Sequence, residues 1–201
     1  LAAEISVSPL RINFQAGKGA ASKFQNFKIF NMSKKQTAYV TLTTYAVPNP
    51  GEKSSQKTKT KVSLGDALKS GLTVSRNRVE IMPGQSKTVR LSNVLPSSPK
   101  KDKVFEVEVM PAVGKLVPVQ HKTKDVEGGI RIVVGYDVGV VIRPEHATAV
   151  VTVTRKGDEA TFRNSGNSNA LISKLKQCRS KDHCIALKNE KRLYAGNVRT
   201  V

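Results

Sequence analysis

The stretch from Gly128 to Pro144, GGIRIVVGYDVGVVIRP, alternates between apolar residues and residues of other kinds. Every even-numbered position from Ile130 to Ile142 is apolar, whereas the odd-numbered positions include glycines, arginines and an aspartate. A period of two is typical of a β-strand with one apolar face. At about 3.3 Å per residue this strand would be about 43 Å long, roughly twice the length of an ordinary strand. The sequence therefore predicts a strand that is longer than one small sandwich can cover.

The chain before this stretch also has the pattern of a β protein. Segments rich in β-branched and aromatic residues alternate with polar turns that contain proline, glycine or asparagine. The segment from Ser63 to Ser70 favours a short helix that ends at Gly71. About seven strands separated by turns are typical of an immunoglobulin-like sandwich. In addition to the opening stretch, strands are predicted at residues 5–14, 24–30, 39–47, 72–82, 86–91 and 103–110.

A second, shorter run of strands follows Pro144, which ends the preceding strand because proline has no N–H to donate. Strands are predicted at residues 149–154, 160–163 and 170–175. We therefore predict an all-β chain with two immunoglobulin-like β-sandwich domains, an N-terminal domain over residues 1–143 and a C-terminal β domain over residues 144–201. The second is small for a sandwich, and small cores are marginally stable. We expect a disulfide to support it or further strands to follow Val201.

The net charge narrows the range of partners. The 201 residues include 34 lysines and arginines against 15 acidic residues, a formal net charge of +19. Such a charge suits nucleic acids, anionic membranes or acidic proteins. The basic runs at 53–61 and 99–103 contain no aromatic residues that stack on bases, which argues against nucleic acid. The apolar runs are too short to cross a membrane, and no secretory signal begins at Leu1, so the chain is either cytosolic or already processed.

No catalytic pattern emerges from the sequence. His121, His146 and His183 lie in polar surroundings, with no serine, cysteine or carboxylate at a spacing that indicates a nucleophile and its base. The pair Gly128-Gly129 precedes a strand rather than a helix, which argues against a phosphate-binding loop. We predict that the protein is not an enzyme and needs no cofactor.

The two cysteines, Cys178 and Cys184, lie close together in CRSKDHC. They are either two free thiols or, in an oxidising compartment, a short-loop disulfide. With His183 they supply too few ligands for zinc, so no metal site is predicted.

Four features occur in an order that is known from one family. They are an N-terminal strand with Arg11 followed by Phe14, the hairpin VEIMPGQSKTVRL from Val79 to Leu91, a long basic insert at 112–129, and the strand IRIVV that leads to Arg-Pro. In these features the chain resembles the periplasmic pilus (fimbrial) chaperones, which are PapD-like proteins of two immunoglobulin-like domains. In its divergence and its basic character, the chain resembles the chaperones of the alternate, CFA/I-like class 5 branch.

The resemblance implies a function and a compartment. Such a chaperone binds, folds and caps pilus subunits in the periplasm by donor-strand complementation and delivers them to an outer-membrane usher. Because the periplasm is oxidising, the resemblance also implies that Cys178 and Cys184 are joined. The competing interpretation is a secreted immunoglobulin-like pilus subunit or adhesin, which would need a free N-terminal donor strand or lack its last strand.

The resemblance also assigns a role to the overlong strand. In the family its first half fills the groove of an unfinished subunit, and its second half packs in the chaperone's own domain. By register, Ile130, Ile132 and Val134 would fill the subunit, while the even-numbered residues from Val138 to Ile142 would pack at home. An exposed strand of this kind also invites self-association of the free chaperone.

The family further implies a site for the subunit's C-terminal carboxylate. Arg11 matches the first of its two basic anchors, but Gly139 stands where the family has the second, a lysine. Either another cation replaces this lysine, or the grip depends more on strand pairing. Asp102 and Arg143 match the positions of the family's interdomain salt bridge, which predicts a structural role for both.

Overall fold

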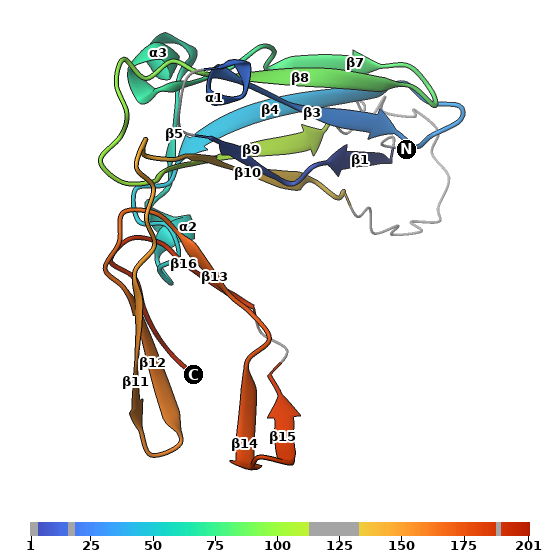
Figure 1. The fold of residues 1–201 in the computed structure, drawn as a ribbon. Coiled ribbons are helices and arrows are strands. Elements are labelled where there is room, and N and C mark those ends of the chain that lie inside the picture. Colours follow the sequence, from blue (N-terminus) through green and yellow to red (C-terminus); the bar gives the residue numbers. More distant parts are fainter. Residues whose placement is uncertain (1–3, 16–18, 113–132, 188–189) are drawn as a thin grey trace.

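The computed structural model describes residues 4–15, 19–112, 133–187 and 190–201. Strands dominate it, and Figure 1 shows two stacked sheets in the N-terminal part and a group of smaller sheets at one end of them. The predicted all-β, two-domain architecture is confirmed. The exact boundary between residues 143 and 144 stays a prediction.

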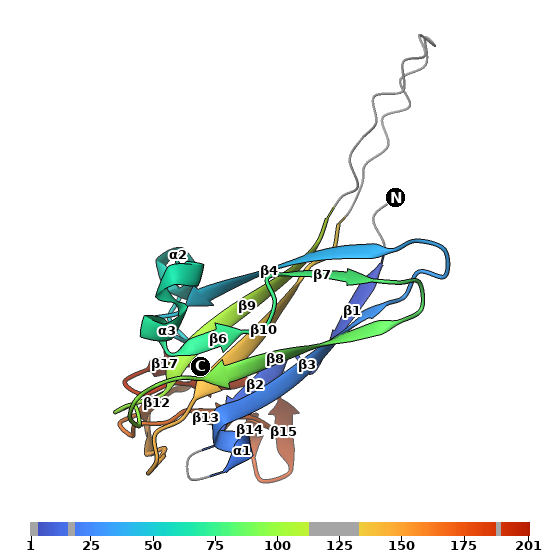
Figure 2. The same cartoon turned by 90° about the horizontal axis from the view of Figure 1, so that it is seen from above.

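The N-terminal part contains two sheets, which Figure 2 shows from above. The predicted strand at 5–14 is divided between them at Pro9, so that its first half joins one sheet and its second half joins the other. Strand β10 lies between β2, with which it is parallel, and β9, with which it is antiparallel. The first sheet has the order β1 (Ile5–Ser8), β3 (Phe24–Asn31), β8 (Ser86–Asn93), β6 (Leu72–Val74); the second has β2 (Arg11–Phe14), β10 (Tyr136–Ile142), β9 (Lys103–Pro111), β4 (Ala38–Ala46), β5 (Thr60–Lys61), with β7 (Arg78–Ile81) also on β4.

Short helices occupy the connections. The helix expected at 63–70 is present as a 3-10 turn, η1 (Leu64–Asp66), followed by α3 (Ala67–Ser70). It ends at Gly71 with a φ of 99°, a left-handed conformation that glycine adopts without a steric cost. The other two are α1 (Ala20–Lys23) and α2 (Ser55–Thr58).

The core lies between the two sheets and is filled by alternate residues of every major strand. On β10, Val138 and Val140 are completely buried and Ile142 is 1% exposed, as the sequence predicted. Val134, four residues before Val138, is 59% exposed and lies outside this core. Ile130 and Ile132 lie outside the described residues, so the full length of the predicted strand is not tested.

The C-terminal part consists of one three-stranded sheet and two strand pairs, all antiparallel. Cys178 and Cys184 face each other in the last of these pairs and form a disulfide, which confirms the expected linkage. Several of its apolar side chains are exposed, including Val153 on β11 and Ile185 on β15. The elements are β11 (Val151–Lys156), β12 (Glu159–Asn164) and β17 (Val198–Thr200); β13 (Ala170–Ile172) with β16 (Lys191–Leu193); and β14 (Lys176–Ser180) with β15 (His183–Ala186).

The difference in burial along this segment predicts different responses to the same substitution. Val138→Thr places a hydroxyl where the valine is fully buried, and should lower the free energy of unfolding by about 1–3 kcal/mol. Val134→Thr changes an exposed side chain, so its free energy of unfolding should stay within about 0.5 kcal/mol of that of the parent. Urea denaturation of the two variants measures both values. Equal losses would show that the segment before β10 also packs in the core.

Candidate functional site

The site begins with the placement of Arg11 on strand β2. Ile12 and Phe14 point into the core, so Arg11 and Asn13 lie on the opposite face of the same sheet. Arg11 is the register partner of Gly139 on the parallel strand β10. Because Gly139 has no side chain, the outer face of the sheet is left open on the β10 side of Arg11.

The guanidinium of Arg11 is only partly satisfied by the protein. Its Nη1 donates a hydrogen bond to the hydroxyl of Tyr194, 3.3 Å away. Tyr194 directly follows strand β16 in the C-terminal part. Its Nε and Nη2 are buried and have no hydrogen-bond partner among the described residues. A buried donor without an acceptor is costly, and more so when it carries a charge. Arg11 thus offers two N–H groups to an acceptor at the place where the two parts of the chain meet.

Two further arginines lie close to this point. Arg192 on β16 donates from Nη1 to the side-chain oxygen of Asn169, 2.5 Å away. Partial burial lowers the pKa of Arg192, and the positive charges of Arg11 and Arg143 lower it further. The Nε of Arg143 is also buried without a partner among the described residues. The charges of two guanidinium groups therefore act on that of Arg192 at this junction.

Asp102 joins the two parts of the chain through hydrogen bonds. Its carboxylate, in a residue only 7% exposed, accepts from the Ser168 hydroxyl at 2.9 Å and from the backbone N–H of Asn169 at 2.7 Å. It also accepts from the side-chain amide of Asn169. The backbone N–H of Asp102 donates in turn to the carbonyl of Asn167. Asn169 therefore links Asp102 to Arg192, and this chain of contacts holds the Arg192 side chain in place.

The salt bridge expected between Asp102 and Arg143 is not formed in this structure. Both carboxylate oxygens of Asp102 already accept hydrogen bonds from neutral donors of the C-terminal part. Within the described ranges, the one ion pair closer than 4.0 Å joins Lys59 and Glu106. Asp102 thus occupies the junction that the sequence predicted for it, but with different partners.

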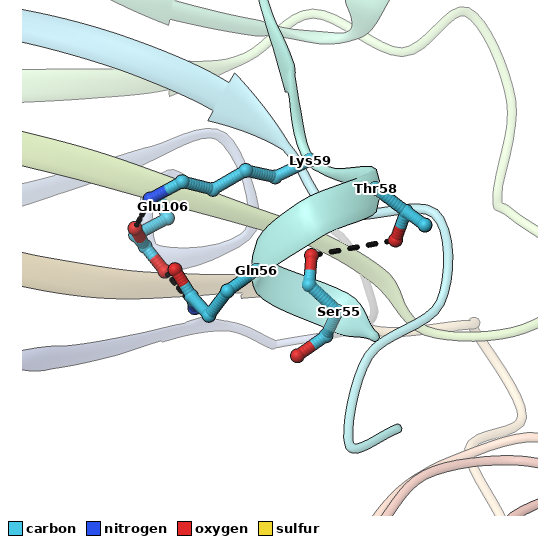
Figure 3. A network of polar contacts seen from close by, with 5 residues as sticks. All are labelled: Ser55, Gln56, Thr58, Lys59 and Glu106. Atoms are coloured by element: carbon cyan, nitrogen blue, oxygen red, sulfur yellow. Dashed lines mark hydrogen bonds and ion pairs between the residues drawn. The ribbon is translucent and has the colours of Figure 1, made fainter. Parts of the chain in front are cut away.

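The pair of Lys59 and Glu106 fastens α2 to the outer face of strand β9 (Figure 3). The ammonium of Lys59 lies 2.5 Å from one carboxylate oxygen, and the Gln56 amide donates to the other at 3.1 Å. The hydrogen bond to Glu106 raises the pKa of Lys59. Both carboxylate oxygens of Glu106 accept bonds within this network, which indicates a structural role rather than a binding site.

Little else in the described structure suggests chemistry. His183 shares a hydrogen bond with the Ser180 hydroxyl in the β14–β15 hairpin, and His121 lies outside the described residues. Within the described ranges, no three histidine, cysteine, aspartate or glutamate side chains are close enough together to hold a metal ion. None of the helices seen there is long and apolar enough to cross a membrane.

Sequence reasoning identified Arg11 but missed Arg192 and Tyr194. These two lie in a short basic segment, EKRLYAG, that matches no motif and resembles many solvated turns. The one signal available in the sequence was that Arg192 and Tyr194 flank an apolar residue, Leu193, which is fully buried in the structure. It shows that the two side chains share a face, but not that this face meets strand β2.

The bonds of Asp102 predict a large effect of its removal. Asp102→Ala leaves the buried donors of Ser168 and Asn169 without an acceptor, at about 1–3 kcal/mol for each group. The midpoint of thermal unfolding should fall by about 6 °C or more. Asp158→Ala, in the exposed turn between β11 and β12, is the matched control, and its midpoint of thermal unfolding should fall by less than about 2 °C. Similar midpoints for the two variants would contradict this account of the junction.

Comparison with known proteins adds to this description. No protein-family model matches the sequence, and no curated protein matches it. Solved structures do match in fold, over nearly the whole chain.

Three examples define the likeness. The class 5 fimbriae chaperone CfaA is 18% identical, with a TM-score of 0.66 over 98% of this chain and 84% of that chain. A chain of a chaperone–tip adhesin complex of CFA/I fimbriae biogenesis is 20% identical, with a TM-score of 0.63 over 98% of this chain and 85% of that one. A chain of the CsuC–CsuE chaperone–tip adhesion subunit complex from Acinetobacter baumannii is 13% identical, with a TM-score of 0.57 over 97% and 91%. Identities this low show the fold, and the fold of this chain is that of the fimbrial chaperones.

Proposed function

We propose that this chain is a periplasmic chaperone of the class 5 type. It binds pilus subunits, folds and caps them by lending them a strand, and delivers them to an outer-membrane usher. Residues 1–143 form the domain that lends the strand, and residues 144–201 form the C-terminal β domain. The observation that carries the proposal is the division of one apolar alternation, in which Val138 is buried in the home core and Val134 is 59% exposed.

The part of this alternation that precedes β10 is suited to fill another protein. The sequence predicts that Ile130, Ile132 and Val134 share one apolar face, because successive even-numbered residues of a strand point the same way. Backbone hydrogen bonds at the strand's edge hold any extended partner, and the alternate side chains select its pockets. At about 25 cal/mol per Å² of apolar surface, three buried aliphatic side chains contribute several kcal/mol before ordering costs.

Arg11 supplies the second element of recognition. The last strand of a captured subunit ends in a carboxylate, and a guanidinium with two free N–H groups binds a carboxylate in a bidentate manner. The buried Nε and Nη2 of Arg11, which have no hydrogen-bond partner in the part of the chain that the structure describes, are the donors that such an anion needs. The subunit would therefore be fixed both by strand pairing and by its chain end, which sets the register of the pairing.

The comparisons support this class of partner. The similar structures include complexes whose partners are a tip adhesin and the SafA pilin of Salmonella enterica. The disulfide between Cys178 and Cys184 fits an oxidising compartment such as the periplasm. Capture of a subunit requires neither catalysis nor a cofactor.

The competing interpretation, a pilus subunit or adhesin, finds less support. A subunit that receives a donor strand lacks the last strand of its own sandwich. In this chain β10 occupies that place, hydrogen-bonded between β2 and β9. The sandwich already contains the strand that a subunit would have to borrow.

Replacing the three aliphatic residues of the proposed donor segment tests its role. The variant with Ile130→Thr, Ile132→Thr and Val134→Thr should lose subunit capture, because the apolar side chains that fill the subunit's pockets are gone. Its circular dichroism spectrum should remain that of the parent. The control carries Val151→Thr and Val153→Thr, which change exposed aliphatic residues of β11.

Co-expression with one pilus subunit, followed by measurement of complex yield, separates the outcomes. Capture at the parental level by the triple variant would overturn the role of the strand. A collapsed β spectrum would show instead that the three residues belong to the protein's own core.

Removal of Arg11 tests the anchor. Arg11→Ala should weaken subunit binding by roughly 30- to 5,000-fold, because truncating one partner of a buried charge pair costs about 2–5 kcal/mol. Arg11→Lys should restore only part of the binding, since an ammonium does not reproduce the planar fork. Arg78→Ala on the exposed β7 position is the matched loss of one positive charge. Equal complex yields from Arg11→Ala and Arg78→Ala would identify Arg11 as one more solvated cation.

A further inference from the structure

We propose that Arg192 supplies the second cation for the subunit's C-terminal carboxylate, in place of the lysine that Gly139 does not provide. This inference rests on the proposed function. It assigns the carboxylate to two arginines from different parts of the chain, Arg11 on β2 and Arg192 on β16.

The position of Gly139 shows what is missing. Gly139 pairs in register with Arg11, so a side chain there would lie beside the guanidinium-bearing residue on the same face of the sheet. The space exists, because the nearest neighbour of an added Cβ would be the Leu10 carbonyl oxygen at 3.8 Å. Strand β10 thus leaves both a gap and a missing charge next to Arg11.

The chain around strand β16 reaches Arg11 from the C-terminal part. Tyr194, directly after β16, contacts Arg11 through its hydroxyl, and Arg192 lies two residues earlier, close enough for the charge of Arg11 to act on it. Asn169 accepts a hydrogen bond from Arg192 and is itself fixed by the carboxylate of Asp102. Arg192 is therefore held at the junction, close to Arg11, by a hydrogen bond to a neutral amide.

The charges at the junction favour an anion. Burial and the nearby charges of Arg11 and Arg143 both act against the charged form of Arg192. The nearest carboxylate, that of Asp102, is occupied by the donors of Ser168 and Asn169. A bound carboxylate would satisfy the free N–H groups of Arg11 and relieve the repulsion between the guanidinium groups.

Arg143 is the other cation near the junction, and its position is less favourable. It directly follows β10, four residues beyond Gly139, the partner of Arg11, which is about 13 Å along the chain. Its backbone N–H donates to the carbonyl of Phe14, at the far end of β2 from Arg11. Arg143 is therefore the comparison residue in the test.

The test uses the last strand of a pilus subunit that the chaperone captures, synthesised as one peptide with a free carboxylate and one with a C-terminal amide. The parent should bind the acid at least about tenfold more tightly than the amide, and Arg11→Gln should abolish that preference. Arg192→Gln should reduce the preference to about threefold or less, and Arg143→Gln should leave it unchanged. A purely structural role of Arg192 would weaken both peptides equally.

Gly139→Lys provides the complementary gain of function. Added to Arg192→Gln, it should restore the preference for the acid, because it returns a cation to the empty place beside Arg11. A parent without any preference for the acid would overturn the carboxylate anchor of the proposed function itself. A preference that depends on Arg11 but survives Arg192→Gln, or that is lost with Arg143→Gln, would overturn the role of Arg192 alone.

Discussion

The buried carboxylate of Asp102 holds the site together, because it fastens the C-terminal sheets to the end of the N-terminal sandwich. Hydrogen bonds to a charged acceptor contribute about 1.5–3 kcal/mol each, and here they connect segments 66 and 67 residues apart. The same carboxylate fixes Asn169, which in turn holds Arg192. The placement of Arg192 and Tyr194 near Arg11 thus depends on Asp102, which is not itself part of the proposed carboxylate site.

Strand β10 belongs to the core only in part. Its second half is fixed between β2 and β9, and its buried valines contribute to the stability of the sandwich. Val134, which precedes β10 in the same apolar pattern, is exposed and lies outside that core. Under the proposed function this rigid base is useful, because a lent strand that is already ordered lowers the cost of binding.

The cluster of arginines illustrates a conflict between stability and function. Among the described residues, Nε and Nη2 of Arg11 and Nε of Arg143 are buried without a hydrogen-bond partner, which costs stability. Under the proposed function, the carboxylate of a partner supplies the missing acceptor. By contrast, both carboxylate oxygens of Glu106 find donors in Lys59 and Gln56.

The sequence by itself determined most strands of the N-terminal sandwich, the apolar face of Val138, Val140 and Ile142 and the end of α3 at Gly71. These features follow from local periodicity and backbone preference, which depend on residues close together in the sequence. Arg11 and the pairing of Cys178 with Cys184 were identified only through a resemblance. The partners of Asp102 and the approach of Tyr194 to Arg11, 183 residues away, were decided by the tertiary structure. The resemblance implied that Asp102 would pair with Arg143, but the packing of the C-terminal sheets places the neutral donors of Ser168 and Asn169 against the carboxylate. No local pattern encodes such a contact, since it depends on how two separately folded surfaces meet.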